Sequence, residues 1–171
     1  MKRNAAPAER VFIALGANLG DPRRQLDAAI AALAHTERVV GCSTWHTTTP
    51  VGGPPGQPDY LNGVVEVRSD REPEELLSRL QQLEQRFGRV RGEPNGPRTL
   101  DLDLLIFGDR RIATTTLELP HPRMEERLFV LAPLAEIAPE LVLRNGRSAA
   151  LQLQHLRRMA NLAPSRVDPT G

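Results

Sequence analysis

The fold is decided by residues 96–107, GPRTLDLDLLIF, where a short polar loop runs into a stretch of strand character. From residue 100 to residue 107, leucine and aspartate alternate before the sequence becomes wholly apolar, a pattern typical of a strand with one buried face. Aspartate is a poor strand former, so two of them in one strand need either water or a compensating cation. We therefore expect a buried strand over 100–107 with a chemically unusual second face.

Five further elements are expected before this strand, and their order defines the fold class. Each helix opens with a proline in its first turn and carries apolar residues at helical spacing. The expected strands cover 10–15, 38–49 and 60–67, and the expected helices begin at Asp21 and Pro22 and at Pro73, the second closing at Gly88. The succession β-α-β-β-α-β predicts an α+β, ferredoxin-like fold, an antiparallel sheet with helices packed on one face.

The chain beyond residue 107 is expected to form a C-terminal extension of the same domain. Its expected parts are a hairpin around Gly108 and Asp109, a helix over 124–137 and a further amphipathic helix over 151–159. There is no internal repeat and no shift in composition that would mark a second domain. We predict a single domain over 10–162, with flexible tails at 1–9 and 163–171.

A chain of 171 residues and 18.9 kDa can bury one core and is too short for a large multidomain protein. No apolar run approaches the ~20 residues that a bilayer span requires. The single cysteine, Cys42, cannot form an internal disulfide. We expect a soluble, monomeric protein of the reducing cytoplasm with no membrane partner.

Arginine supplies almost all of the positive charge, because Lys2 is the only lysine among 22 basic residues. This excludes a buried Schiff-base lysine and the phosphate-binding lysine of a P-loop or a protein kinase. An anionic ligand must therefore be held by arginine. The formal net charge of +1 gives no reason to expect a nucleic-acid partner.

Asp101 and Asp103 lie two residues apart on the expected strand, so their carboxylates point to the same face. Paired carboxylates beside a substrate phosphate are ligands that Mg²⁺ prefers. Arg89, Arg91 and Arg98 precede the pair, and guanidinium groups beside a carboxylate-bound metal suit a polyphosphate. The alternative is a solvated strand face next to an ordinary charged loop.

Tyr60 and Asn62 project from one side of an expected strand that follows a loop rich in proline and glycine. An aromatic face and a side-chain amide together suit a flat heterocycle with a donor and acceptor edge. Phe129 offers a second aromatic face, and His121, between two prolines, is placed to contact a phosphate. The alternatives are a cross-strand tyrosine, a turn asparagine, a core phenylalanine and a structural histidine.

Several motifs in one order resemble the 6-hydroxymethyl-7,8-dihydropterin pyrophosphokinase family. The specific ones are GPRTLDLD at 96–103 and QPDYLN at 57–62. Supporting matches are found at 12–18, at Glu84 with 88–91, and at Pro120 and His121 followed by Arg127 and Phe129. The resemblance implies transfer of pyrophosphate from ATP to the hydroxymethyl group of the pterin, leaving AMP, in folate biosynthesis.

The resemblance also implies a role for individual residues. Asp101 and Asp103 would hold two Mg²⁺ ions and, with Arg89 and Arg91, form the catalytic group. The ATP site would be formed by Glu84, Arg91, Arg98, Leu104, His121 and Arg127. The pterin site would be formed by Thr48, Pro50, Val51, Tyr60, Asn62, Asn95 and Phe129. Asn95 stands where many family members have an aromatic residue. The resemblance therefore implies that this chain lacks one stacking contact over the bound ligands.

Two other classes of function stay open at the level of sequence. A ferredoxin-like fold also serves RNA-binding and regulatory domains, but RNA recognition favours aromatic residues and a basic sheet face, where this chain has Asp101 and Asp103. A metal-dependent glycosyl transferase can use an Asp-x-Asp pair. That class usually has a longer chain and leaves the arginine loop and Asn62 unexplained.

Overall fold

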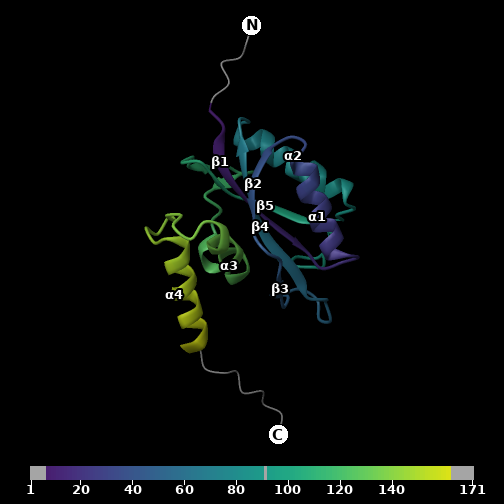
Figure 1. Cartoon of the computed structure of the whole chain (residues 1–171). Helices are drawn as coiled ribbons and strands as arrows, with labels where there is room; N and C mark the ends of the chain where they lie inside the picture. The colour runs from purple at the N-terminus through teal and green to yellow at the C-terminus, as the bar shows by residue number, and fades with distance from the viewer. Residues whose placement is uncertain (1–6, 91, 163–171) are drawn as a thin grey trace.

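A computed structural model describes residues 7–90 and 92–162, and its centre is a five-stranded antiparallel sheet (Figure 1). The strands run in the order β2-β4-β1-β5, and β3 pairs with the other part of β4. The strands are β1 (Glu9–Ala17), β2 (Arg38–Cys42), β3 (His46–Thr48), β4 (Tyr60–Ser69) and β5 (Asp101–Phe107). The predicted ferredoxin-like class is confirmed, and β1 begins one residue before the expected domain boundary.

Helices α1 (Pro22–Leu33) and α2 (Pro73–Arg86) pack on one face of the sheet (Figure 1). The Asp21 carboxylate caps α1 by accepting a hydrogen bond of 3.1 Å from the Arg24 amide, and Pro22 opens its first turn. Alternate residues of β1 point to this face, so Val11 and Ile13 are fully buried beneath the two helices.

Helices α3 (Leu128–Ile137) and α4 (Ala149–Leu162) lie on the other side, where α3 covers the sheet and α4 packs on α3 (Figure 1). Phe12 and Val64 are buried in this second core. The two helices of the ferredoxin-like unit lie on one face as predicted, and the C-terminal extension covers the face that this unit leaves open. An RNA-binding surface of the usual kind would need that face free.

The strand expected over 38–49 is two strands, β2 and β3, separated at 43–45. Ser43 interrupts the ladder because its hydroxyl oxygen accepts a hydrogen bond of 2.9 Å from the Val64 amide. Trp45 crosses to the α1 side, where its indole Nε1 donates to Asp27 at 3.1 Å. Gly63 leaves the space for the indole ring, since a Cβ there would lie 2.5 Å from it.

Two other expected elements differ in detail. The chain turns at Gly108, but the paired strands of the hairpin are β6 (Ile112–Ala113) and β7 (Glu118–Leu119), joined by 114–117. The helix expected over 124–137 is a 3-10 turn, η1 (Met124–Glu126), followed by α3, because Arg127 has an extended backbone. Across the described ranges, no helix is both long enough and apolar enough to cross a bilayer.

Candidate functional site

The carboxylate pair lies on the α3 side of β5. Leu102 and Leu104 alternate with Asp101 and Asp103, and both leucines are buried in the core beneath α1 and α2. Leu104 is only 3% exposed. Its side chain therefore points away from the carboxylates, into the core.

Gly16 of β1 stands between Asp101 on β5 and Asn62 on β4. The register pairs Gly16 with both residues, so the three lie in one line across the sheet. With strands ~4.8 Å apart, Asp101 and Asn62 are separated by roughly 10 Å over a residue without a side chain. Ala14 occupies the same position between Asp103 and Val64. Two small residues of β1 therefore lie between the carboxylates of β5 and the facing residues of β4.

Asp101 belongs to a charged network that joins α2, the loop after it and β5. Its oxygens accept from Arg98 at 2.7 Å and Arg89 at 2.9 Å, and Arg89 also pairs with Glu84. The Glu84 carboxylate is nearly buried and accepts from the Leu102 amide at 2.8 Å. Burial raises the pKa of Glu84, against the opposing effect of the Leu102 amide and Arg89. The network holds the arginine loop against β5.

Asp103 has a different environment. Within the part of the chain that the structure describes, its carboxylate makes no ion pair and no side-chain hydrogen bond. Burial and the nearby charge of Asp101 raise its pKa to about 6, while Arg127 acts in the opposite direction. Such an uncompensated carboxylate, next to a second one, fits a hard divalent cation. No cluster of three or more His, Cys, Asp or Glu occurs in 7–90 and 92–162, so other ligands would be water and substrate oxygens.

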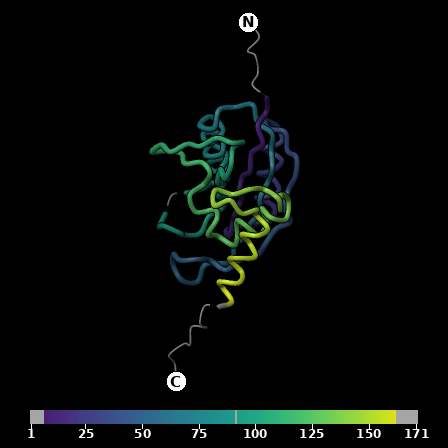
Figure 2. Tube along the Cα trace, turned by 90° about the vertical axis from the view of Figure 1, so that its left-hand side faces the viewer, coloured from purple at the N-terminus to yellow at the C-terminus, as the bar shows by residue number. Residues whose placement is uncertain are grey.

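Two loop segments, 50–59 and 92–100, meet at the same end of the sheet (Figure 2). Asn18, only 2% exposed, joins them: its amide nitrogen donates to the Pro58 carbonyl at 3.1 Å, and its oxygen accepts from the Arg98 amide at 2.8 Å. The Gln57 side chain crosses between the loops and donates to the Asn95 carbonyl at 3.0 Å. The sequence offered Asn18 and Gln57 only as parts of matching motifs, without this role.

The predicted pterin residues lie in three places: on the sheet, on α3 and in the two loops. On the sheet, Asn62 Nδ2 donates to Thr48 Oγ1 at 2.6 Å, and the Tyr60 hydroxyl donates to the Gly96 carbonyl at 3.0 Å. Burial raises the pKa of Tyr60. On α3, Phe129 is half-buried, with the Arg127 guanidinium 5.6 Å above its ring. The remaining three lie in the loops: Pro50, the exposed Val51, and Asn95, which has φ 56°.

Two of the predicted phosphate residues, His121 and Arg127, come from the chain after β5. The His121 amide donates to the Leu105 carbonyl at 2.8 Å, which fixes this residue beside β5. Burial, with the charges of Arg127 and Arg123, lowers the pKa of His121. Arg91 lies outside the described residues.

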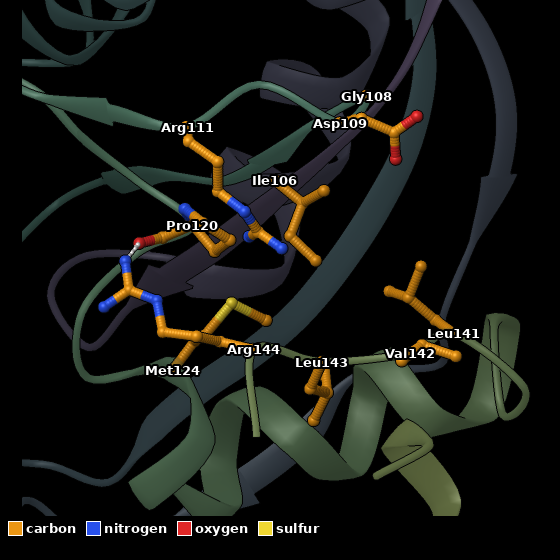
Figure 3. A pocket seen from close by; sticks show the side chains of 10 residues that line it. All are labelled: Ile106, Gly108, Asp109, Arg111, Pro120, Met124, Leu141, Val142, Leu143 and Arg144. Carbon is orange, nitrogen blue, oxygen red and sulfur yellow. Dashed lines mark hydrogen bonds between the residues drawn. The ribbon is translucent and has the colours of Figure 1, made fainter. Parts of the chain in front are cut away.

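A separate pocket of about 80 Å³ lies at the other end of β5, next to the turn at Gly108 (Figure 3). Arg111 reaches between Ile106 and Pro120, and Arg144 donates to the Pro120 carbonyl at 3.3 Å. None of the residues that line it belongs to the predicted site.

The sheet, the carboxylate pair and the arginine loop are those of a phosphate-transferring enzyme, and comparison with known proteins identifies its family. Residues 12–139 match the model of the 7,8-dihydro-6-hydroxymethylpterin-pyrophosphokinase (HPPK) family. The chain is 47% identical over 143 residues to a 2-amino-4-hydroxy-6-hydroxymethyldihydropteridine pyrophosphokinase of Synechocystis sp., covering 82% of this chain and 72% of that protein. It is 44% identical to the enzyme of that name from Pseudomonas aeruginosa, covering 81% of this chain and 86% of that protein.

Solved structures agree at the level of fold. Wild-type HPPK-DHPS of Plasmodium falciparum superposes with a TM-score of 0.71 over 94% of this chain at 13% identity. The match covers 43% of that longer protein, so this chain corresponds to less than half of it. The chain belongs to the HPPK family, as its motifs predicted.

Proposed function

We propose that this enzyme transfers the pyrophosphoryl group of ATP to the hydroxymethyl oxygen of 6-hydroxymethyl-7,8-dihydropterin and leaves AMP, a step of folate biosynthesis. Family membership supports the reaction type. The structural observation that supports it most is the line formed by Asp101, Gly16 and Asn62. Asp101, proposed for the phosphate end, and Asn62, proposed for the pterin end, share one sheet face with only Gly16 between them.

The metal ligands would be Asp101 and Asp103, and we propose two Mg²⁺ ions. The uncompensated Asp103 carboxylate and its oxygen chemistry fit such ions. Bound there, Mg²⁺ would supply neutralisation of the triphosphate charge. Asp101 gives one carboxylate to this site while it keeps Arg98 and Arg89 close to the phosphates.

The phosphate chain of ATP would be held by arginine. Arg89 and Arg98 approach from the loop side and Arg127 from the start of α3, and Arg91 is proposed as a fourth cation. His121 would contact the nucleotide, and Glu84 would form part of its wall by holding Arg89. Positioning and charge stabilisation dominate phosphoryl transfer, so the absence of an assigned general base is consistent with the reaction.

The pterin would lie over Gly16, with its amide edge toward the Asn62 and Thr48 pair. Tyr60 and Phe129 would flank the ring from the sheet and from α3. Pro50, Val51 and Asn95 would contribute from the two loops. These loops, which Gln57 already connects, would exclude water from the reacting phosphate.

Further properties of the chain are also proposed. We propose that it acts as a monomer in the cytoplasm, on ATP and the pterin alone, with no nucleic-acid or membrane partner. The proposed domain covers 10–162. The near-neutral net charge of +1 supports a locally cationic site, since it leaves no broad basic surface.

The test is product analysis with purified protein, ATP, Mg²⁺ and 6-hydroxymethyl-7,8-dihydropterin. We expect AMP only when all are present. Asp103→Ala removes one proposed metal ligand, and we expect turnover to fall by about 10²-fold or more with an unchanged circular dichroism spectrum. Glu126→Ala, a loss of one carboxylate on η1, is the control. ADP as the product, or near wild-type turnover by Asp103→Ala, would overturn the proposal.

A further inference from the structure

Glu136, near the end of α3, holds the edge of the sheet through three hydrogen bonds. Its Oε1 accepts from the Thr44 amide at 2.7 Å, and its Oε2 accepts from the Thr44 hydroxyl at 2.9 Å. His46 Nε2 lies 2.9 Å from the same Oε2. We call Glu136, Thr44 and His46 the α3 clamp. None of these residues belongs to the predicted pterin or ATP site.

The α3 clamp acts on a strand that has little other support. β3 contains three residues, and in the described sheet it pairs with β4 only. Residues two apart on an extended chain point to one side, so Thr44, His46 and Thr48 form a single row toward α3. Glu136 holds the first two members of this row, and Asn62 donates to the third. A shift at the clamp is therefore transmitted to Thr48.

The same helix carries Phe129, which is proposed to flank the pterin ring. Phe129 and Glu136 are seven residues apart, about two helical turns, and so lie on one face of α3. Phe129 is proposed to flank the pterin ring, whereas Glu136 fixes the distance between α3 and β3. The distance between Phe129 and Thr48 is thus set by the contacts of Glu136 with Thr44 and His46.

We propose that Glu136, Thr44 and His46 are positioning residues that set the affinity for the pterin by holding Thr48 and Asn62 at a fixed distance from Phe129. This inference rests on the proposed function. Burial raises the pKa of Glu136, but the hydrogen bonds from His46 and Thr44 outweigh it and hold that pKa below its ordinary value, which indicates a charged acceptor.

The first experiment compares Glu136→Ala and Glu136→Gln with Glu140→Ala. Glu140 is an exposed glutamate four residues further on, and it lies 3.8 Å from Arg10, away from the α3 clamp. Calorimetry measures the Kd of the pterin and of Mg-ATP separately. We expect Glu136→Ala to weaken pterin binding about 10-fold, and Glu136→Gln about 3-fold because its amide oxygen still accepts from the Thr44 amide. The ATP Kd is expected to stay within about 2-fold of wild type.

Equal pterin Kd values for Glu136→Ala and Glu140→Ala would overturn the proposal, as would a parallel loss of ATP and pterin binding. Amide hydrogen exchange of the free protein separates the clamp from the proposed function. In Glu136→Ala we expect faster exchange at the β3 amides that bond to β4 and unchanged exchange at Val65. Wild-type exchange rates at those β3 amides would refute the clamp. If the wild type makes no AMP but Glu136→Ala still exchanges faster in β3, the proposed function is wrong, while the role of Glu136 in holding β3 is supported.

Discussion

Arg98 occupies one carboxylate oxygen of Asp101, with Nη1 of the arginine 2.7 Å from Oδ2. Arg89 occupies the other oxygen at 2.9 Å. Asp103, two residues along the same strand, has no such partner among the described residues. The two carboxylates of the proposed metal site therefore differ: Asp101 is paired with two guanidinium groups, and Asp103 with none among the described residues. A cation at Asp101 must compete with a guanidinium group.

Arg98→Ala is expected to change metal and nucleotide binding in opposite directions. Removal of the guanidinium frees Oδ2 of Asp101, so Mg²⁺ measured without ATP is expected to bind about 3- to 10-fold more tightly. ATP is expected to bind at least about 10-fold more weakly, because a phosphate partner is lost. Calorimetric titration with each ligand alone measures both. A weaker Mg²⁺ affinity in the variant would contradict the competition.

Arg89→Ala is expected to destabilise the free protein. The Glu84 side chain is only 9% exposed and would lose its cation, leaving a nearly buried carboxylate with the Leu102 amide alone. We expect a loss of about 1–3 kcal/mol in the free energy of unfolding, measured with urea. The loss is expected to shrink when Glu84→Gln is already present. Arg86→Ala, at the exposed end of α2, is the control, and an equal loss there would rule out the buried pair as the cause.

Gly16→Ala is expected to damage the pterin end of the site. A Cβ at this position would lie 2.9 Å from Asn62 Oδ1, so the Asn62 side chain must move. We expect pterin affinity to fall about 10-fold or more, because a displaced amide loses its alignment with the ligand. Gly41→Ala is the matched control, since a Cβ there meets nothing within 4 Å. A calorimetric Kd for Gly16→Ala equal to that of the control would show that pterin binding does not need this glycine.

His121 is expected to lower the free energy of unfolding at acidic pH. Burial, with Arg127 and Arg123, lowers its pKa against the smaller opposing effects of Glu118 and Asp101. The unfolded chain takes up a proton near pH 6.5 that the folded chain resists, so this contribution to stability is lost as pH falls below about 6.5. The free energy of unfolding of His121→Gln is therefore expected to fall less than that of the wild type between pH 7.5 and 5. Parallel pH profiles would contradict the assignment.

Local signals predicted much of the fold, and non-local pairing explains what they missed. Prolines at 22 and 73 marked both helix starts correctly, because a first-turn proline acts within its own segment. The break at Ser43 depends on a hydrogen bond from Val64, 21 residues away, and no local pattern records it. The covering of the second sheet face by α3 likewise depends on tertiary packing.

For the candidate site too, local spacing predicted some features and non-local pairing decided the others. Alternation along β5 predicted that Asp101 and Asp103 share a face, since a strand has a period of two. The line through Gly16 depends on the register of three strands, which sequence spacing does not give. Leu104 was assigned to the ATP site through the resemblance alone. The same alternation turns its side chain to the other face of the sheet, into the core beneath α1 and α2.

The most direct test of the central claim follows the β-phosphate. The enzyme is incubated with Mg²⁺, 6-hydroxymethyl-7,8-dihydropterin and ATP that carries a radioactive β-phosphate, and the products are separated by chromatography. Pyrophosphoryl transfer predicts the label in the pterin product together with unlabelled AMP. Label recovered in ADP would instead show attack at the γ-phosphate, and it would contradict the account.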